Sequence, residues 1–329
     1  INMKKILVTG GAGFVGRHII ERHLKLGNEV HCVDNLSLFT GAKDPKNGWP
    51  LYNPKDYRTF HFYHEDCRDY FKKNSSTYFD YVFHLAAMVG GRLMIENNPL
   101  AVADDLSIDS EFWQWASTAK PRKTICFSSS AAYPVRLQRE KTYVLLSENM
   151  IDLNQDIGIP DMSYGWAKIT HEYLAKLAFE KYGINSVIYR PFSGYGEDQD
   201  DTYPFPSICK RILKDRGKDI VHVWGTGKQM RDFIHIKDCV NGIFQTMDKI
   251  DNCEALNLST GIFTSFIEFA KKASNIVSYN PKIIGMSDKP TGVFARAGDT
   301  SKQKLYGFRA QIDLQKGLER ALQYYENKF

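Results

Sequence analysis

A tyrosine and a lysine four residues apart are the residues of this chain whose types and spacing most directly suggest chemistry. Tyr164 and Lys168 lie in the segment SYGWAK, which has the pattern of a helix start. Residues four apart occupy one helix face, about a turn from each other, so both side chains point into the same space. An ammonium beside a phenol favours the phenolate and lowers the phenol pKa from about 10. The pair predicts a tyrosine that exchanges protons with a hydroxyl group, although this spacing alone is common on solvated helix surfaces.

Three consecutive serines are expected close to this pair. Ser128, Ser129 and Ser130 follow the apolar run at residues 124–127, which predicts a buried strand. Open α/β sheets bind ligands at the carboxyl ends of parallel strands. A serine at this point can therefore hydrogen-bond a reacting oxygen, whereas without the other motifs the run would be an ordinary polar loop.

A glycine-rich loop near the start of the chain is the second chemical signal. The sequence GGAGFVG at residues 10–16 follows one predicted strand and opens a helix. Glycine permits the tight turn and the approach of the backbone to a pyrophosphate, and the helix N-terminus offers free N–H groups to phosphates. Asp34 closes the next strand about 20 residues later, the spacing of a carboxylate that binds a ribose hydroxyl. Because this carboxylate would repel a 2′-phosphate and Asn35 rather than arginine follows it, we predict NAD and not NADP.

The elements that must position these residues alternate along the chain. Strands separated by helices predict a parallel sheet with helices on both faces, that is, an α/β Rossmann-type, doubly wound fold. The segment 36–57 is rich in glycine and proline and is expected to be a long loop, and 134–160 is expected to be irregular. We expect strands at 4–9, 29–33, 59–62, 81–85, 124–127 and 186–189, and helices at 14–26, 163–182 and 207–216.

The pattern loosens after Gly194, which predicts a smaller C-terminal lobe. We assign residues 3–193 and 232–259 to the NAD-binding domain. Residues 194–231 and 260–329 are assigned to the substrate-binding lobe.

Composition excludes several classes of function. The net charge of +5 suits an anionic small substrate but lacks the concentrated basic surface of a nucleic-acid-binding protein. The six cysteines are scattered without a C-x-x-C pair, so we expect neither a metal site nor a disulfide framework. No apolar run approaches the length of a membrane span, and no signal segment is evident. We therefore expect a cytoplasmic protein without membrane partners.

Together these motifs resemble the extended short-chain dehydrogenases/reductases, the family of nucleotide-sugar epimerases and dehydratases. The resemblance covers nearly the whole chain. It implies an NAD-dependent enzyme acting on a nucleotide-diphosphate sugar, and relatives often form homodimers through the helix that carries Tyr164. The motifs are TGGAGFVG at 9–16, DN at 34–35, DCRD at 66–69, HLAA at 84–87, the serine run, Tyr164 with Lys168, RPF at 190–192, VWGTG at 223–227, RDFIH at 231–235 and RAGD at 296–299.

The resemblance also implies roles for individual residues on the cofactor side. Asp66 would hold the adenine amino group, Ala86 and Ala87 would line the cofactor trough, and Lys168 would also bind the nicotinamide ribose. The full set of expected cofactor-binding residues is Gly10, Gly13, Phe14, Val15, Gly16, Asp34, Asn35, Asp66, Cys67, Leu85, Ala86, Ala87, Tyr164, Lys168 and Pro191.

On the substrate side, Arg231 and Arg296 would clamp the diphosphate, a role that suits the planar fork of arginine. The catalytic hydroxyl falls on Ser129 when counted back from Tyr133, and on Ser130 when counted from the strand start. We prefer Ser129. The expected substrate-binding residues are Met88, Gly90, Ser193, Trp224, Arg231 and Arg296.

Departures from the family pattern bear on the reaction. Sugar 4,6-dehydratases carry Thr-Asp-Glu where this chain has residues 129–131 as SSA, so no carboxylate pair is present to remove water. The MVGG segment at 88–91 resembles GDP-mannose 3,5-epimerase and GDP-fucose synthase, which favours a GDP-linked sugar. Those enzymes use a cysteine where Ala131 stands, which disfavours 3,5-epimerisation. Ser193 replaces a usual asparagine near the sugar, so unusual sugar recognition is expected.

The expected mechanism begins with Tyr164 taking the proton of a sugar hydroxyl at C4 while hydride passes to NAD. If the 4-keto sugar turns over and is reduced on its other face, the enzyme is a 4-epimerase, which we favour. If the keto sugar leaves, it is a net 4-dehydrogenase. A non-catalytic NAD-binding sensor or scaffold is the alternative of another class, but Tyr164 and Lys168 are both retained. His171 is expected nearly opposite Lys168 on the helix, in a structural or exposed position.

Overall fold

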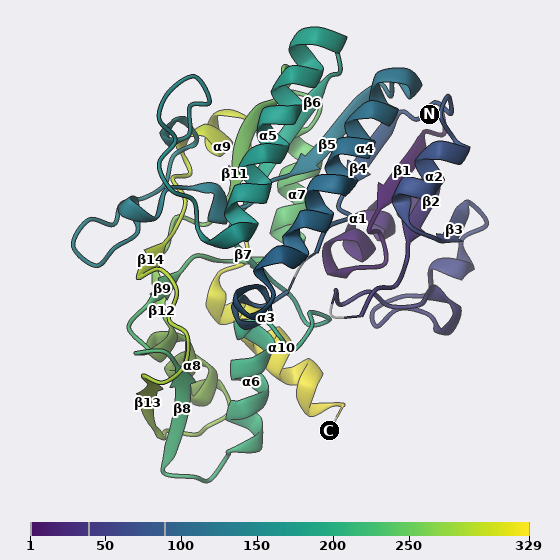
Figure 1. Ribbon diagram of the computed structural model, residues 1–329. Coiled ribbons are helices and arrows are strands. Elements are labelled where there is room, and N and C mark those ends of the chain that lie inside the picture. The colour runs from purple at the N-terminus through teal and green to yellow at the C-terminus, as the bar shows by residue number, and fades with distance from the viewer. Residues whose placement is uncertain (1, 39, 89, 329) are drawn as a thin grey trace.

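A seven-stranded parallel sheet forms the centre of the larger part of the molecule (Figure 1). The computed structural model describes residues 2–38, 40–88 and 90–328. The strand order is β11-β6-β5-β4-β1-β2-β3, and each neighbouring pair is parallel. The strands are β1 (Lys5–Thr9), β2 (Glu29–Asp34), β3 (Phe60–His64), β4 (Tyr81–His84), β5 (Lys123–Phe127), β6 (Ser186–Pro191) and β11 (Glu254–Leu258).

Helices cover both faces of this sheet, because successive strand side chains point to opposite sides. Ile6 and Val8 belong to one buried core with residues of α1 and α7. Leu7, between them in β1, belongs to a second core with residues of α2, α4 and α5. This arrangement confirms the predicted Rossmann-type fold. The helices are α1 (Phe14–Lys25), α2 (Cys67–Lys73), α4 (Ala103–Ala119), α5 (Met162–Tyr182) and α7 (Ile236–Thr246).

The predicted elements agree with the structure except at their ends. Helix α5 ends at Gly183, whose backbone is left-handed (φ 68°), as is common for a helix C-cap. The helix expected at 207–216 begins earlier, as α6 (Pro204–Lys214), because proline fits the first helical position. The described residues of the segment 36–57 form a loop, as predicted, with 3₁₀ turns at Pro45–Asn47 and Pro54–Asp56.

The smaller part of the molecule gathers below the large sheet in Figure 1. Its core contains aromatic and aliphatic side chains such as Phe205, Phe269 and Leu318. Three short sheets have the orders β10-β7, β12-β9-β14 and β13-β8. The α-helices and strands not yet named are α3 (Arg92–Asn97), β7 (Ser193–Tyr195), β8 (Ile220–Trp224), β9 (Met230–Arg231), β10 (Phe233–His235), β12 (Thr264–Ser265), α8 (Phe266–Ile276), β13 (Lys282–Met286), β14 (Ala295–Arg296), α9 (Ser301–Leu305) and α10 (Leu314–Glu326).

The two parts are interleaved in sequence, and two residues pack in the core of the part opposite to their predicted domain. Phe233 packs in the core of the smaller part, although it was assigned to the NAD-binding domain. Phe308 packs against the large sheet, although it was assigned to the substrate-binding lobe. The division into domains therefore stays a prediction. None of the described helices is long and apolar enough to cross a membrane.

Candidate active site

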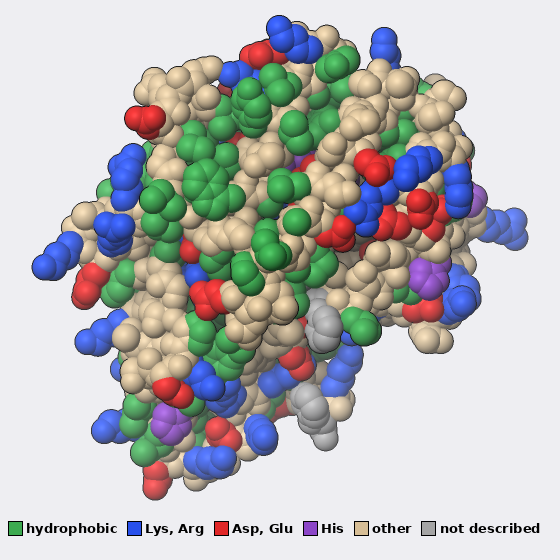
Figure 2. All heavy atoms as spheres, viewed as in Figure 1, with side chains coloured by type: hydrophobic (Ala, Val, Ile, Leu, Met, Phe, Trp, Pro, Cys, Tyr) green, Lys and Arg blue, Asp and Glu red, His purple; other side chains and the backbone are tan. Residues whose placement is uncertain are grey.

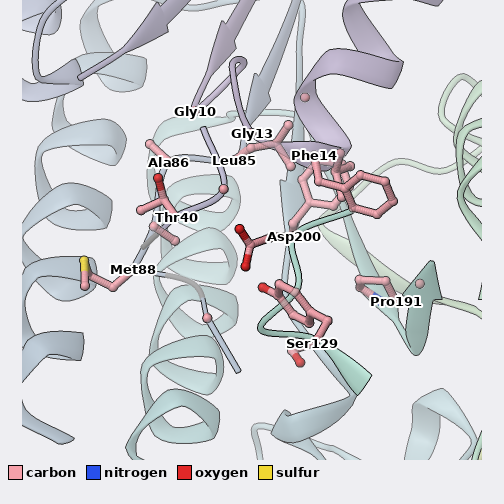
Figure 3. A pocket seen from close by; sticks show the side chains of 18 of the residues that line it. Gly10, Gly13, Phe14, Thr40, Leu85, Ala86, Met88, Ser129, Pro191 and Asp200 are labelled. Atoms are coloured by element: carbon pink, nitrogen blue, oxygen red, sulfur yellow. The ribbon is translucent and has the colours of Figure 1, made fainter. Parts of the chain in front are cut away.

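A pocket of about 420 Å³ opens at the carboxyl edge of the large sheet. It is lined by the glycine loop, by the ends of β2, β4 and β5, by the start of α5 and by segments of the smaller part. Figure 3 shows Phe14, Asp200 and Ser129 around this cavity. All the predicted catalytic and cofactor-binding residues line it, and so do Met88, Gly90, Ser193, Arg231 and Arg296. Val89, which belongs to the MVGG segment, lies outside the described residues.

Glycine is required at two points of the loop. Gly10 has a φ of +64°, and a Cβ atom there would lie 2.7 Å from the backbone nitrogen of Ala86. A Cβ atom at Gly16 would lie 2.6 Å from the Cα atom of Gly11. Gly13 is the N-cap residue of α1 and has no side chain to cap the helix. The first backbone N–H groups of α1 are therefore left for a ligand. A loop without side chains at the N-terminus of a helix fits a pyrophosphate.

Asp34 ends β2 beside this loop and lines the pocket. Its Oδ2 accepts a hydrogen bond from the amide of Ala12 at 3.0 Å, and its Oδ1 accepts one from the amide of Leu36 at 2.8 Å. Burial raises the pKa of this carboxyl, and the two amides oppose that rise. The carboxylate therefore anchors the glycine loop, and each oxygen keeps a second lone pair for a ribose hydroxyl.

Asp66 lies at the other end of the cofactor side, where it caps α2 by accepting a hydrogen bond from the amide of Arg68. The Arg68 guanidinium donates to both carboxylate oxygens, at 3.0 and 2.7 Å. These hydrogen bonds hold the pKa of Asp66 below its usual value. An ionised acceptor at the pocket wall suits an amino group.

Arg17 supports the cofactor side from beneath, and the sequence motifs did not reveal it. Its buried guanidinium donates to the carbonyl oxygens of Ala12, Gly41 and Asp198 at 2.9, 3.1 and 2.9 Å, and it forms an ion pair with the Asp198 carboxylate. It thereby joins the glycine loop to the long loop 36–57 and to the chain after β7. The one sequence signal was an arginine on the buried face of a predicted helix.

Tyr164 and Lys168 are brought together as predicted. The Lys168 Nζ lies 5.4 Å from the centroid of the Tyr164 ring and donates to the carbonyl oxygen of Phe127 at 3.0 Å. Burial works against the charged lysine, but the negative potential from Tyr164, Asp109 and Asp105 raises its pKa overall. The lysine is therefore a fixed cation beside the phenol.

The three serines have different environments. Ser128 is buried and donates to Glu172 Oε2 at 2.5 Å, and Glu172 in turn pairs with Arg190, so this hydroxyl belongs to an internal network. Ser129 is partly exposed, and its Oγ accepts from the amide of Ala131 at 3.0 Å, which leaves its O–H to donate to a ligand. Ser130 is buried but lines the pocket as well. The choice of Ser129 over Ser130 stays a prediction.

His171 lies on the same side of α5 as Lys168, and the expectation of a nearly opposite position was wrong. Residues three apart on a helix are neighbours, and His171 is buried with its Nδ1 3.3 Å from Asp109 Oδ2. The other Asp109 oxygen lies 3.0 Å from Nε2 of His84, whose Nδ1 contacts Thr9 Oγ1 at 2.8 Å. Burial opposes the charge, but Asp109 raises the pKa of His171 to about 10. The carboxylate of Asp109 thus links α5 to the end of β4, whose His84 contacts Thr9 at the end of β1.

Arginine side chains dominate the substrate side. Arg231 and Arg296 are register partners on the parallel strands β9 and β14. Arg231 donates to backbone oxygens of Met230 and Val293 at 2.8 and 2.9 Å. Burial, and then the charges of Arg296 and Arg92, lower the pKa of Arg231 to about 9. Like charges held on neighbouring strands repel each other, so this wall favours an anionic ligand.

One carboxylate partly offsets these cations. Asp161 Oδ2 accepts from Arg296 at 2.7 Å and forms a second ion pair with Arg92. Burial opposes ionisation of Asp161, but Arg296 and Arg92 lower its pKa overall. Arg296 also donates to Oε1 of Gln138 at 2.5 Å. These residues come from separate segments of the chain, and no sequence motif predicted that they would lie together.

Trp224 is the one predicted substrate-binding residue that does not line this pocket. It lies on β8 with 37% of its surface exposed, and the Lys289 ammonium lies 5.8 Å from its ring. Its contact with substrate stays a prediction.

The pocket also includes residues that sequence reasoning did not select, among them Thr40, Gly41, Asp200 and Tyr203. The length of the loop 36–57 was the one signal for the first two.

A glycine loop at a helix start, an acid at the end of the second strand and a Tyr–Lys pair on a doubly wound sheet define a dinucleotide-dependent oxidoreductase. The profile of the NAD dependent epimerase/dehydratase family matches residues 6–259. The chain belongs to this family, as the resemblance implied, and it is an NAD-dependent enzyme of the extended short-chain dehydrogenase/reductase type.

Three similar proteins each match nearly the whole chain. It is 24% identical to GDP-L-colitose synthase of Yersinia pseudotuberculosis over 98% of each chain. It is 25% identical to a UDP-glucose 4-epimerase of Thermotoga maritima, solved with UDP-glucose, with a TM-score of 0.82 and coverage of 98% and 99%. It is also 25% identical to a UDP-glucuronic acid 4-epimerase of Bacillus cereus, solved with UDP-glucuronic acid and NAD, with a TM-score of 0.82 and coverage of 99% and 100%. Both GDP- and UDP-linked chemistry therefore occur among similar proteins.

Proposed function

We propose that this enzyme is a nucleotide-sugar 4-epimerase that oxidises C4 of its sugar, with a GDP-linked sugar favoured. The observation that carries the proposal is the Lys168 ammonium, which is fixed 5.4 Å from the Tyr164 ring at the wall of the pocket. That arrangement stabilises a phenolate next to the place where a sugar hydroxyl would lie.

The cofactor side fits NAD residue by residue. Gly10, Gly13 and the start of α1 would receive the pyrophosphate, and Asp34 would accept from the adenosine ribose. Asp66 would accept from the adenine amino group, while Lys168 would also donate to the nicotinamide ribose. When bound, NAD supplies an acceptor for the hydrogen that leaves C4 with its electron pair.

Arg231 and Arg296 line one wall of the pocket, called the arginine wall below. Their charges favour a substrate that carries a nucleoside diphosphate. Arg231 and Arg296 would share the two phosphate groups, because a bound dianion removes the repulsion between the guanidinium groups. Met88 and Gly90 would contact the sugar, with Ser193 on the opposite side. The GDP preference rests on the MVGG segment and on the resemblance to GDP-sugar enzymes.

Tyr164, with Ser129 and Lys168, would transfer the proton at the C4 hydroxyl. Tyr164, as phenolate, accepts the proton of the C4 hydroxyl, and Ser129 hydrogen-bonds the same oxygen. Lys168 stays charged throughout and stabilises the phenolate before Tyr164 takes the proton and after it returns it. After the 4-keto sugar turns over in the pocket, Tyr164 returns the proton to the oxygen at C4 as hydrogen is restored to the other face.

The serine run supports simple epimerisation over dehydration. Residues 129–131 contain no carboxylate to remove water, and Ala131 is buried and cannot move a proton. A net 4-dehydrogenase would use the same first step and would release the keto sugar.

A panel of GDP- and UDP-sugars tests this proposal. Product NMR should show a C4-inverted sugar without stoichiometric absorbance of reduced nicotinamide. Accumulated reduced nicotinamide with a keto product would establish the dehydrogenase instead. The Tyr164→Phe variant should bind NAD and leave every sugar unchanged, and an active variant would contradict the assignment.

We also propose a homodimer formed through α4 and α5. Trp166 and Tyr173 lie seven residues apart on α5, 48% and 47% exposed, and Leu106 on α4 is 41% exposed. Figure 2 shows hydrophobic side chains over these two helices. Light scattering should give twice the chain mass for the native protein and a monomer for Trp166→Glu. A native monomer would contradict this proposal.

A further inference from the structure

Two histidines and a glutamate converge at the amino ends of β2 and β3. Glu29 and His31 are two residues apart on β2, so they point to the same face of the sheet. His61 on β3 is the register partner of His31. Parallel strands place these residues at the edge of the sheet opposite the pocket, because Asp34, at the carboxyl end of β2, lines that pocket.

The side-chain atoms are close enough to share one ion. Glu29 Oε1 lies 2.7 Å from His31 Nε2 and 3.7 Å from His61 Nε2, and the potential ligand atoms all lie within 4.8 Å of one another. Ligand distances of about 2.0–2.1 Å in a tetrahedral zinc site put neighbouring ligand atoms roughly 3.3 Å apart. Side-chain movements of about an ångström would therefore complete such a site.

A hydrogen bond with Tyr63 orients the His31 ring for metal binding. The Tyr63 hydroxyl lies 2.9 Å from His31 Nδ1, which directs Nε2 toward Glu29, as a hydrogen-bonded second nitrogen does in metal-bound histidine. Lys5 on β1, the register partner of Glu29, directs its ammonium to the Phe79 ring, 5.2 Å from the ring centroid.

Access from solvent is also available. The Glu29 and His61 side chains are 27% and 44% exposed, whereas that of His31 is 10% exposed. A metal ion could enter from the side of His61 and retain a water molecule as its fourth ligand.

We infer that Glu29, His31 and His61 form a binding site for a divalent transition metal ion, with Zn²⁺ as the expected ion. Two imidazoles with one carboxylate suit zinc and exclude Mg²⁺ and Ca²⁺, which prefer oxygen ligands alone. The site joins β3, the edge strand of the sheet, to β2. The site has no linear sequence motif, because its ligands come from two strands separated by the long loop 36–57.

The role of this ion is to stabilise the sheet edge. A metal that binds the folded chain and not the unfolded chain raises stability by RT ln(1 + [metal]/Kd). Since the ligands lie at the opposite edge from the pocket, the site is independent of the reaction proposed above.

Zinc binding to the metal-free, full-length protein tests the inference. Competition with a chromophoric chelator should show one Zn²⁺ per chain. Glu29→Gln and His61→Gln should each weaken binding at least tenfold, since each removes one of three ligands. Both positions are partly exposed, so circular dichroism should show folded variants. His222→Gln, which removes an exposed histidine on β8, is the matched control and should bind zinc like the native chain.

Thermal unfolding provides a second readout. Zn²⁺ should raise the unfolding temperature of the native chain and of His222→Gln, and the increase should be lost in His61→Gln. Equal zinc affinity in the native chain, Glu29→Gln and His61→Gln would overturn the inference. A loss in His222→Gln equal to that in His61→Gln would also overturn it, because the ion would then be bound by surface histidines in general.

Discussion

The two sides of the pocket carry positive potential in different ways. On the cofactor side it comes from backbone N–H groups at the start of α1, where Gly10 and Gly13 keep the surface free of side chains. On the substrate side it comes from guanidinium groups, with Arg231 and Arg296 opposed on neighbouring strands. A backbone site depends on a few adjacent residues, whereas a side-chain site depends on the partners that hold each arginine. The two sides should therefore respond differently to substitution.

Tyr164→Phe should have the largest effect, because the pair with Lys168 lies between the two sides and serves both. We expect turnover to fall by about 10³-fold, within the range of general acid–base catalysis. The Kd for NAD, measured by fluorescence titration, should change less than threefold. Tyr182→Phe, at an exposed tyrosine at the end of the same helix, is the control. Turnover within tenfold of the native value would exclude Tyr164 as the proton acceptor.

Arg296→Met tests whether the substrate side acts separately. The substitution removes a charged hydrogen-bond donor worth about 2–3 kcal/mol, so kcat/KM should fall by about 100-fold while the Kd for NAD stays unchanged. Arg139→Met, at an exposed position, should have no effect. Parallel losses of sugar and NAD binding would show that the two sides are not independent. Thermal unfolding separates a local effect from loss of fold, because Asp161 keeps Arg92 as a partner.

Asp109→Asn tests the buried cluster that Asp109 forms with His171 and His84. Asp109 raises the pKa of His171 from 6.5 to about 10. A group whose pKa is higher in the folded state stabilises the fold fully below its unfolded pKa, and this contribution disappears as the pH rises through the folded value. The native chain should therefore lose stability between pH 7 and pH 10.

The substitution should lower the free energy of unfolding by about 2 kcal/mol at pH 7 and should flatten its change between pH 7 and pH 10. Urea unfolding at both pH values provides the measurement. The lowered pKa of His84 acts below about pH 6.5 and does not enter this window. An unchanged pH slope would show that His171 is neutral in the folded protein.

The sequence predicted the cofactor side better than the substrate side for a physical reason. The glycine loop, Asp34 and the Tyr–Lys pair are defined by short spacings, and a regular strand or helix converts each spacing directly into a position. Arg17 could not be recognised, because its role depends on contacts with Gly41 and Asp198, which are distant in sequence.

The same limit applies to the arginine wall. Arg231 and Arg296 were selected by resemblance, but their arrangement depends on pairing between strands more than 60 residues apart. Asp161 and Gln138 contact Arg296, and Arg92 pairs with Asp161, through tertiary packing alone. The long loop 36–57 was correctly predicted as irregular, yet nothing in its composition placed Thr40 at the pocket.

Gly10→Ala should have the smallest effect and gives the sharpest test of the backbone-built side. Gly10 and Gly183 share a left-handed backbone, with φ of +64° and +68°. A methyl group at Gly10 would meet the backbone of Ala86, whereas no atom lies within 4 Å of one at Gly183. Gly183→Ala should lose about 1 kcal/mol of stability from the backbone conformation, and Gly10→Ala should lose more, because its methyl group also meets the Ala86 backbone. Only Gly10→Ala should also raise the Kd for NAD, by about tenfold, equivalent to 1.4 kcal/mol. If Gly183→Ala weakened NAD binding equally, the effect would come from general destabilisation, and the close approach of the glycine loop to Ala86 would not determine cofactor affinity.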